Sequence, residues 1–288
     1  MRWTAADLPD QSGRTVVVTG ANSGLGLATA REFARAGAHV VLAVRNTDKG
    51  EAAAASIAGS TEVRRLDLAD LASVRRFADK WDRPIDILVN NAGLTSRTLG
   101  HTVDGFEMHM GTNHFGHFAL TQHVLPLITD RIIVLASLAH RRTTMDLSDL
   151  GWDRRTYTWL AAYGQSKLAN LLFASELQRR LTESRSPVKV VAAHPGWATT
   201  GLNLDDDVPV FERVMTAVGD RVVAQSPEAG AWPTLFAATA DIAGGSYVGP
   251  DGRFETRGHP TLVGRSSEAS DPELARRLWE VSERATST

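Results

Sequence analysis

The sequence predicts an α/β fold, in which a doubly wound, mostly parallel sheet of seven strands is covered by helices on both faces. Short runs rich in β-branched residues alternate with Ala- and Leu-rich stretches of helical length from residue 14 to about residue 248. No linker, repeat or low-complexity tract interrupts this alternation. A chain of 288 residues, 43% of them hydrophobic, is also the right size for one large α/β domain. We therefore expect a single domain over residues 1–288.

Each expected strand is a short apolar run bounded by turn residues. The seven are Thr15–Thr19, Ala38–Val44, Glu62–Leu66, Ile85–Asn90, Arg131–Ala136, Val188–Ala193 and a short one near Tyr247. Helices of ordinary length are expected between them, at Leu25–Ala36, Asp48–Ile57, Leu71–Trp81, Asn113–Ile128, Tyr163–Glu183 and Ala229–Ala240. Right-handed crossovers bring the carboxyl ends of parallel strands to one edge of the sheet, where we expect the ligand site.

Two connections that start at such strand ends are unusually long, namely Leu138–Ala162 and Ala198–Ser226. Trp152, Tyr157 and Trp159 in the first either form a wall for an apolar substrate or pack the segment on the domain. Residues 208–218 in the second carry an apolar stripe at near-helical spacing. We expect residues 198–226 to cover the substrate. The alternatives for the stripe are a core-facing helix and a peripheral membrane contact. Residues 265–288 are expected to form a C-terminal helical tail.

Composition excludes several classes of function. The formal net charge is −2 and the charges are mixed along the chain, so we expect no nucleic-acid partner. The chain has no cysteine, which removes disulfides, thiolate catalysis and cysteine-bound metals. Neither a signal-peptide pattern nor a run of 18 apolar residues occurs. A cytoplasmic protein with no integral membrane segment is expected.

Glycines cluster where the first strand turns into the first helix. The spacing is Gly-x-x-x-Gly-x-Gly, without the Gly-Lys-Ser/Thr of a phosphate-binding P-loop. Backbone N–H groups at such a helix start can hold the pyrophosphate of a dinucleotide, as in a Rossmann fold. The residues expected to bind it are Gly20, Asn22, Ser23, Gly24, Leu25 and Gly26.

Arg45 follows the second strand, where an NAD-binding fold usually carries Asp or Glu for the ribose hydroxyls. A guanidinium can grip a 2′-phosphate through two hydrogen bonds, whereas a carboxylate would repel it. Arg45 therefore favours NADP(H) over NAD(H), the alternative being a solvated surface arginine.

Tyr163 and Lys167 stand four residues apart at the start of an expected helix, so they share one face. A phenol with an ordinary pKa of about 10 transfers protons poorly near neutral pH unless a cation stabilises the phenolate. Ser137 ends the fifth strand and could polarise a carbonyl oxygen at the same sheet edge, although a serine there is more often a turn residue.

These motifs together resemble the short-chain dehydrogenase/reductase family. The matching segments run in order from the glycine cluster through Asn90-Asn91-Ala92-Gly93, Asn113, Ser137 and Tyr163-x-x-x-Lys167 to His194-Pro195-Gly196. The sequence around residues 111–118 and 166–173 is similar to the retinol dehydrogenase-like branch, near the WW-domain oxidoreductases and the light-dependent protochlorophyllide reductases. The resemblance covers about residues 13–249.

The resemblance implies specific roles. Tyr163 would be the general acid/base, Lys167 would lower its pKa and bind the nicotinamide ribose, Ser137 would orient the substrate oxygen, and Asn113 would hold a water in the proton relay. Tyr163 is also expected to bind the cofactor. Further cofactor contacts are implied for Asp67 and Leu68 at the adenine, Asn91, Ala92 and Gly93 at the ribose, and Pro195, Gly196, Trp197, Ala198 and Thr200 at the nicotinamide.

The function expected is NADP(H)-dependent interconversion of an alcohol and a carbonyl, acting on CH–OH donors, with a bulky apolar substrate. Many retinol dehydrogenases carry an N-terminal membrane anchor, and because we expect none here, a retinoid is a weaker candidate substrate. The absence of cysteine argues against protochlorophyllide reduction. A non-catalytic NADP(H) sensor or interaction module is the alternative, and the glycine spacing argues against a sugar-nucleotide epimerase. We expect no metal site at His109, His114, His117 and His123, and the sequence leaves open whether the chain forms a homo-oligomer.

Overall fold

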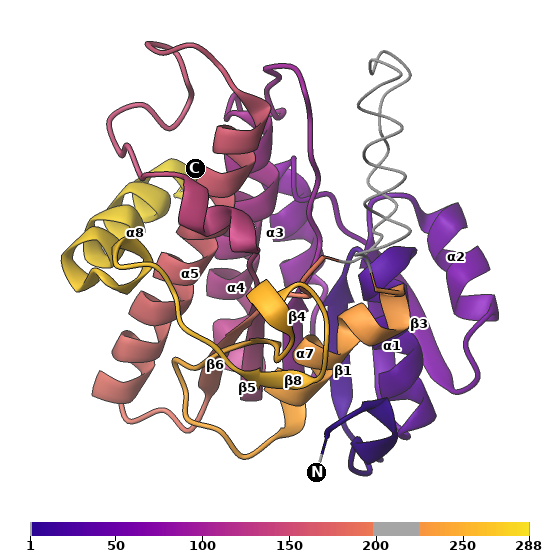
Figure 1. The fold of residues 1–288 in the computed structure, drawn as a ribbon. Coiled ribbons are helices and arrows are strands. Elements are labelled where there is room, and N and C mark those ends of the chain that lie inside the picture. Colours follow the sequence, from indigo (N-terminus) through magenta and orange to yellow (C-terminus); the bar gives the residue numbers. More distant parts are fainter. Residues whose placement is uncertain (1, 198–224, 288) are drawn as a thin grey trace, which may run out of the picture.

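An eight-stranded sheet runs through the centre of the molecule in the computed structural model, which describes residues 2–197 and 225–287 (Figure 1). The strand order is β3-β2-β1-β4-β5-β6-β7-β8, and all neighbours are parallel except β7 and β8. The strand order reverses between β1 and β4, as it does in a doubly wound sheet. The predicted fold class is therefore confirmed.

Every predicted strand is present, with ends shifted by at most a few residues. They are β1 (Thr15–Thr19), β2 (His39–Val44), β3 (Ser60–Arg65), β4 (Ile85–Asn90), β5 (Ile128–Leu135), β6 (Lys189–Ala193) and β7 (Tyr247–Pro250). The strand that the sequence did not predict is β8 (Pro260–Leu262), which pairs antiparallel with β7 at the sheet edge. Three residues are too few to show an alternating pattern, so this strand has no sequence signal of its own.

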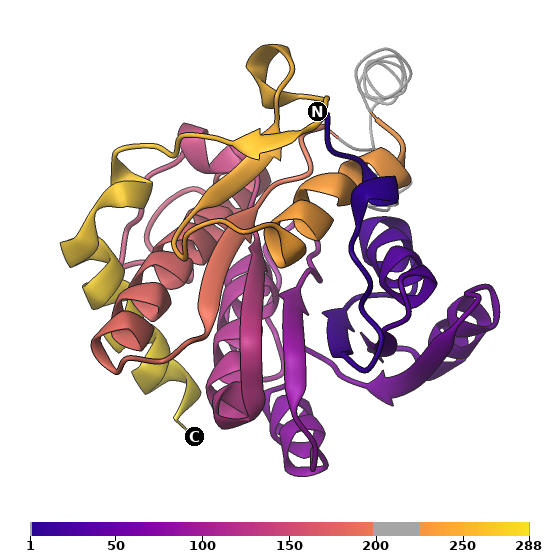
Figure 2. The same ribbon diagram turned by 90° about the horizontal axis from the view of Figure 1, so that it is seen from below.

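Helices cover both faces of the sheet (Figure 2). One face packs against α3 (Leu71–Asp79), α4 (Gly116–Val124), α5 (Trp159–Glu183) and α8 (Pro272–Thr286). The other face packs against α1 (Gly24–Arg35), α2 (Thr47–Ala55) and α7 (Pro227–Thr239). Side-chain caps start α2, α3, α7 and α8, such as the Asn46 side chain that accepts a hydrogen bond from the Lys49 N–H ahead of α2.

The helix expected at Asn113–Ile128 is wrong in its bounds. A π-helical turn at Met110–Phe115 precedes α4, and a short 3₁₀ turn at Leu125–Leu127 follows it. Pro126 has no N–H to continue an α-helical ladder, and Ile128 already belongs to β5. The π-turn places Asn113 in the interior, completely buried.

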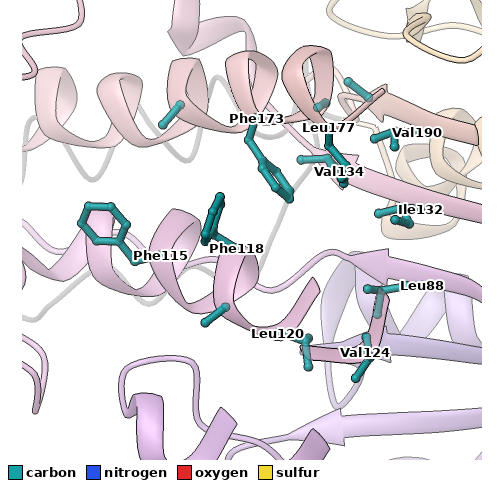
Figure 3. Packing of buried hydrophobic residues seen from close by; sticks show 14 of the residues in the cluster. Leu88, Phe115, Phe118, Leu120, Val124, Ile132, Val134, Phe173, Leu177 and Val190 are labelled. Atoms are coloured by element: carbon teal, nitrogen blue, oxygen red, sulfur yellow. The ribbon is translucent and has the colours of Figure 1, made fainter. Parts of the chain in front are cut away.

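Aromatic side chains fill the layer between the sheet and α4, α5 and α8. Phe118 of α4 and Phe173 of α5 face each other with ring centroids 5.5 Å apart (Figure 3). Trp279 of α8 closes the cluster at 4.9 Å from Phe118. This packing fixes α5 against the sheet, and α5 carries the Tyr163–Lys167 pair. Within the described ranges, no helix combines the length and the apolar character that a membrane crossing requires.

Candidate active site

A cavity of about 910 Å³ lies at the carboxyl ends of the parallel strands. It is lined by loops that follow β1 to β6 and by the first turns of α5. It gathers most of the residues that the sequence singles out, namely Gly20, Asn22, Ser23, Gly24, Leu25, Gly26, Arg45, Asp67, Leu68, Asn91, Ala92, Gly93, Ser137, Tyr163, Lys167, Pro195, Gly196 and Trp197. Ala198, Thr200 and the stripe at residues 208–218 lie outside the described residues.

The glycine loop leaves its backbone open to the cavity. Gly20 has a φ of +67° and Gly24 a φ of +52°, a left-handed conformation that glycine adopts without strain. A Cβ on Gly26 would lie 2.5 Å from the Asn91 Nδ2 and from the Gly20 carbonyl oxygen, so this position has no room for a side chain. Helix α1 begins at Gly24, and its N-terminal N–H groups therefore lie at the cavity wall.

Thr19 ties the glycine loop to the end of β4. Its Oγ1 accepts hydrogen bonds from the backbone N–H groups of Asn91 at 2.9 Å and Ala92 at 2.8 Å. The Asn91 side chain returns a bond from Nδ2 to the Thr19 carbonyl oxygen at 2.7 Å. These reciprocal bonds hold together the ends of β1 and β4, the two strands that flank the switch point of the sheet.

The buried His117 ring also contacts Thr19. Burial lowers the pKa of His117 to about 4, so the ring is neutral near neutral pH. Its Nδ1 lies 3.0 Å from the Asn113 carbonyl oxygen and therefore carries the proton, while Nε2 lies 2.9 Å from the Thr19 Oγ1 and accepts. The backbone oxygen of Asn113 is thereby held by this ring.

Tyr163 and Lys167 project from one face of α5, with the Lys167 Nζ 5.7 Å from the centre of the Tyr163 ring. Burial lowers the pKa of Lys167 to about 8. Burial also raises the pKa of Tyr163, and a hydrogen bond with Ser137 acts in the opposite direction. The phenol is therefore protonated at neutral pH, as a proton donor must be.

Ser137 lies two residues beyond the end of β5 and caps the 3₁₀ turn Leu138–Arg142, with its Oγ accepting from the Ala139 N–H at 3.2 Å. Capping this turn is thus compatible with the predicted role of Ser137 at the substrate oxygen. The carbonyl oxygen of Leu135, at the end of the same strand, accepts from the Lys167 Nζ at 3.2 Å and from the Asn170 Nδ2 at 2.9 Å. These two hydrogen bonds fix helix α5 relative to strand β5 at the site.

Asn113 is placed behind the cavity wall rather than on it. Its Oδ1 accepts from the Leu94 N–H at 2.9 Å, and its Nδ2 donates to the Ser166 Oγ at 3.0 Å. A Cβ on Gly93 would lie 3.4 Å from the Lys167 Nζ and 3.5 Å from the Asn113 Oδ1. These two polar atoms therefore face the same small space beside Gly93.

The aromatic residues of the long connection Leu138–Ala162 have two different environments. Trp159 lines the cavity, whereas Trp152 is buried and packs edge-on against Tyr157 at 5.7 Å. The Tyr157 hydroxyl lies 3.3 Å from a carboxylate oxygen of the buried Glu107 and 3.2 Å from the His109 Nδ1.

The histidines expected to hold no metal have separate partners. His109 pairs with Glu107 at 2.7 Å, and the His114 Nε2 lies 2.8 Å from the Ser282 Oγ. Among the described residues no group of three potential ligands comes together.

Some cavity residues have no signal in the sequence. Leu160, Arg142, Phe254 and Thr256 line the cavity although no motif contains them. Phe254 and Thr256 come from the loop between β7 and β8, so only the unpredicted strand explains their position.

Comparison with known proteins agrees with this geometry. A model of the family described as short chain dehydrogenase matches residues 14–207. Human retinol dehydrogenase 13 is 43% identical over 290 residues, which cover 94% of this chain and 84% of that protein. A solved structure of an uncharacterized protein from Mycobacterium paratuberculosis is 51% identical with a TM-score of 0.88, covering 100% of this chain and 98% of that one. The angucycline C-6 ketoreductase LanV, solved with bound NADP, is 25% identical with a TM-score of 0.65, covering 83% and 94% of the two chains. The chain therefore belongs to the short-chain dehydrogenase/reductase family and is similar to its retinol dehydrogenase-like members.

Proposed function

We propose that the chain interconverts an alcohol and its carbonyl with NADP(H), on an apolar substrate, and that Tyr163 is the general acid/base. One observation carries this proposal: Tyr163, Lys167 and Ser137 line the same cavity as the glycine loop and Arg45. Similarity to a retinol dehydrogenase and to an NADP-bound ketoreductase supports the reaction class. We also propose that residues 1–288 form one dinucleotide-binding and catalytic domain, and that the protein is cytoplasmic.

The residues present fit a dinucleotide. A Cβ on Gly20 would lie 3.0 Å from the Ala92 Cα, and Gly26 has no room for a side chain, so the loop supplies bare backbone where a pyrophosphate would lie. Within the described part of the chain Lys167 donates one hydrogen bond, to Leu135, which leaves two N–H donors for a ribose hydroxyl. A bound NADP(H) supplies or accepts the hydride.

The chain's own groups then handle the substrate oxygen and its proton. Ser137 donates its hydroxyl hydrogen to the oxygen of the carbonyl, and Tyr163 gives up its phenolic proton as negative charge develops there. Lys167 stabilises the phenolate that remains. A water beside Gly93, between the Lys167 Nζ and the Asn113 Oδ1, would return the proton from solvent.

Arg45 carries the choice of NADP(H). It is exposed, it lines the cavity, and it has no hydrogen-bond or ion-pair partner within the described ranges. We expect Arg45→Asp to weaken NADPH binding roughly 10- to 100-fold, the worth of a hydrogen-bonded charge pair, with little change for NADH. Titration of both cofactors by fluorescence measures this. Arg277→Asp on α8 makes the same change of charge away from the cavity and is expected to bind NADPH like the wild type. Tighter binding of NADH than NADPH by the wild type would contradict the assignment.

Turnover tests the reaction itself. The wild-type protein, saturated with NADPH, is mixed with retinal, a steroid ketone, a quinone and an aryl aldehyde, and loss of NADPH absorbance is followed. We expect reduction of at least one apolar carbonyl. Binding of NADPH without turnover of any carbonyl or alcohol would shift the assignment to a non-catalytic NADP(H) sensor.

A further inference from the structure

Exposed hydrophobic side chains gather at the mouth of the cavity. Phe254 is 74% exposed, Trp197 51% and Leu160 49%, and all three line the cavity. They come from three separate segments: the loop after β7, the loop after β6 and the first turn of α5. A single exposed apolar residue is ordinary, but several around one opening mark a surface that binds apolar material.

The backbone that presents Phe254 is strained. Phe254 has a φ of 56° and Glu255 a φ of 55°, so two successive residues with side chains adopt the left-handed conformation. A Cβ disfavours this conformation, and neither residue is of the Asn or Asp type that tolerates it best. The turn therefore needs contacts elsewhere that hold it in place.

Glu255 provides those contacts. Its carboxylate accepts from the Arg141 Nη2 at 2.9 Å and 3.1 Å, one distance to each oxygen, and from the His194 Nε2 at 3.1 Å. The His194 Nδ1 accepts from the Gly196 N–H at 3.2 Å, so the proton of the buried ring is on Nε2 and points at Glu255. A Cβ on Gly249 would lie 2.0 Å from that Nε2, so the ring sits directly on the backbone of β7.

The anchors belong to segments that also form the site. Arg141 lies in the 3₁₀ turn that Ser137 caps, and His194 directly follows β6. The Thr256 carbonyl oxygen accepts from the Trp197 N–H at 2.7 Å, which joins two of the three mouth segments. The loop between β7 and β8 projects beyond the sheet (Figure 2), yet its position is set by groups next to the catalytic serine.

We propose that Phe254 is a specificity-determining residue that binds the distal apolar part of a long substrate as it leaves the cavity, and that Glu255 is the positioning residue that holds it there. This inference rests on the proposed function, since a cavity that holds a dinucleotide and a reacting carbon leaves the rest of a long substrate at the mouth. Short substrates end before Phe254 and do not contact it.

Binding of two straight-chain alcohols, hexanol and dodecanol, tests the inference without turnover. The protein is saturated with NADPH, which cannot oxidise an alcohol, and each alcohol is titrated by calorimetry. We expect Phe254→Ala to weaken dodecanol binding about tenfold, the worth of a lost apolar contact, and to leave hexanol unchanged. Phe254→Leu keeps an apolar side chain and is expected to retain most of the dodecanol affinity. Glu255→Gln is expected to weaken dodecanol in the same direction, again without an effect on hexanol.

The control is Val103→Ala, because Val103 is 81% exposed and does not line the cavity. It is expected to leave both affinities unchanged. Equal effects of Phe254→Ala on the two alcohols, no effect on dodecanol, or no binding of dodecanol to the wild type would overturn the inference. Turnover of hexanal and dodecanal is measured separately. If the protein reduces neither aldehyde but still binds dodecanol through Phe254, the proposed reaction is refuted and the proposed contact stands.

Discussion

Replacing Tyr163 with phenylalanine is expected to lower kcat for carbonyl reduction by about 10²- to 10⁴-fold, the usual contribution of a positioned general acid. The phenol is protonated in the resting protein because burial raises its pKa, so it is ready to donate when negative charge forms on the substrate oxygen. Phenylalanine keeps the ring and its packing but has no proton to give. Single-turnover kinetics with NADPH and the best carbonyl from the screen measures the change.

The matched control is Tyr157→Phe, which removes the same hydroxyl from a residue that does not line the cavity. We expect its kcat to stay within about twofold of the wild type, since its hydroxyl makes long hydrogen bonds with Ser96, Glu107 and His109, none of which is a proposed catalytic group. The dissociation constant of NADPH is expected to be unchanged in Tyr157→Phe, and it is measured in Tyr163→Phe so that the change in kcat is read at saturating NADPH. A Tyr163→Phe protein that reduces carbonyls at the wild-type rate would show that another group supplies the proton.

Acid is expected to unfold the protein because several histidines are buried in the neutral form. Burial lowers the pKa of His114 to about 3 and the pKa values of His117 and His194 to about 4, all below the ordinary value of 6.5. As the pH falls through about 6.5, the unfolded chain binds protons that the folded chain does not. The stability is thus complete above that pH and is lost progressively toward pH 4. Each histidine contributes about 1.4 kcal/mol per pH unit inside this window, so the free energy of unfolding should fall by about 5 kcal/mol between about pH 7 and about pH 5.

Urea unfolding at a series of pH values measures this loss. His117→Gln removes one of these titrating groups and should reduce the pH dependence by up to about a third, whatever it does to stability at neutral pH. The exposed His123 is the control, and His123→Gln should leave the pH dependence as it is in the wild type. A free energy of unfolding that stays constant over this range would mean that the histidines are protonated in the folded state.

The sheet could be predicted from the sequence because its strands are buried on both faces. Runs such as Val16-Val17-Val18 and Ile132-Ile133-Val134 are continuous and apolar, which is the pattern of parallel strands between two helical layers. The glycine loop and the Tyr163–Lys167 pair were also predictable, since each depends on a local spacing in a strand-to-helix turn or on one helix face. The structure places these residues at one cavity.

The remaining features depend on contacts between distant segments. The π-turn that buries Asn113 is set by its bonds to Leu94 and Ser166, and no local pattern encodes it. The loop that carries Phe254 contacts the site through Glu255 and Arg141, which lies 114 positions earlier in the chain. Such positions require the tertiary structure, because propensity and periodicity describe only neighbours along the sequence.

The antiparallel strand β8 makes residues 251–259 a hairpin loop closed at its base by the pairs Val248–Leu262 and Pro250–Pro260. A loop closed in this way can be shortened, lengthened or exchanged while the strands beneath it keep their register. The glycine loop and Arg45 belong to the opposite half of the sheet, around β1 and β2. We therefore expect cofactor choice and substrate choice to be separable traits, and we expect a library randomised only within this hairpin to change substrate preference while NADPH binding stays intact.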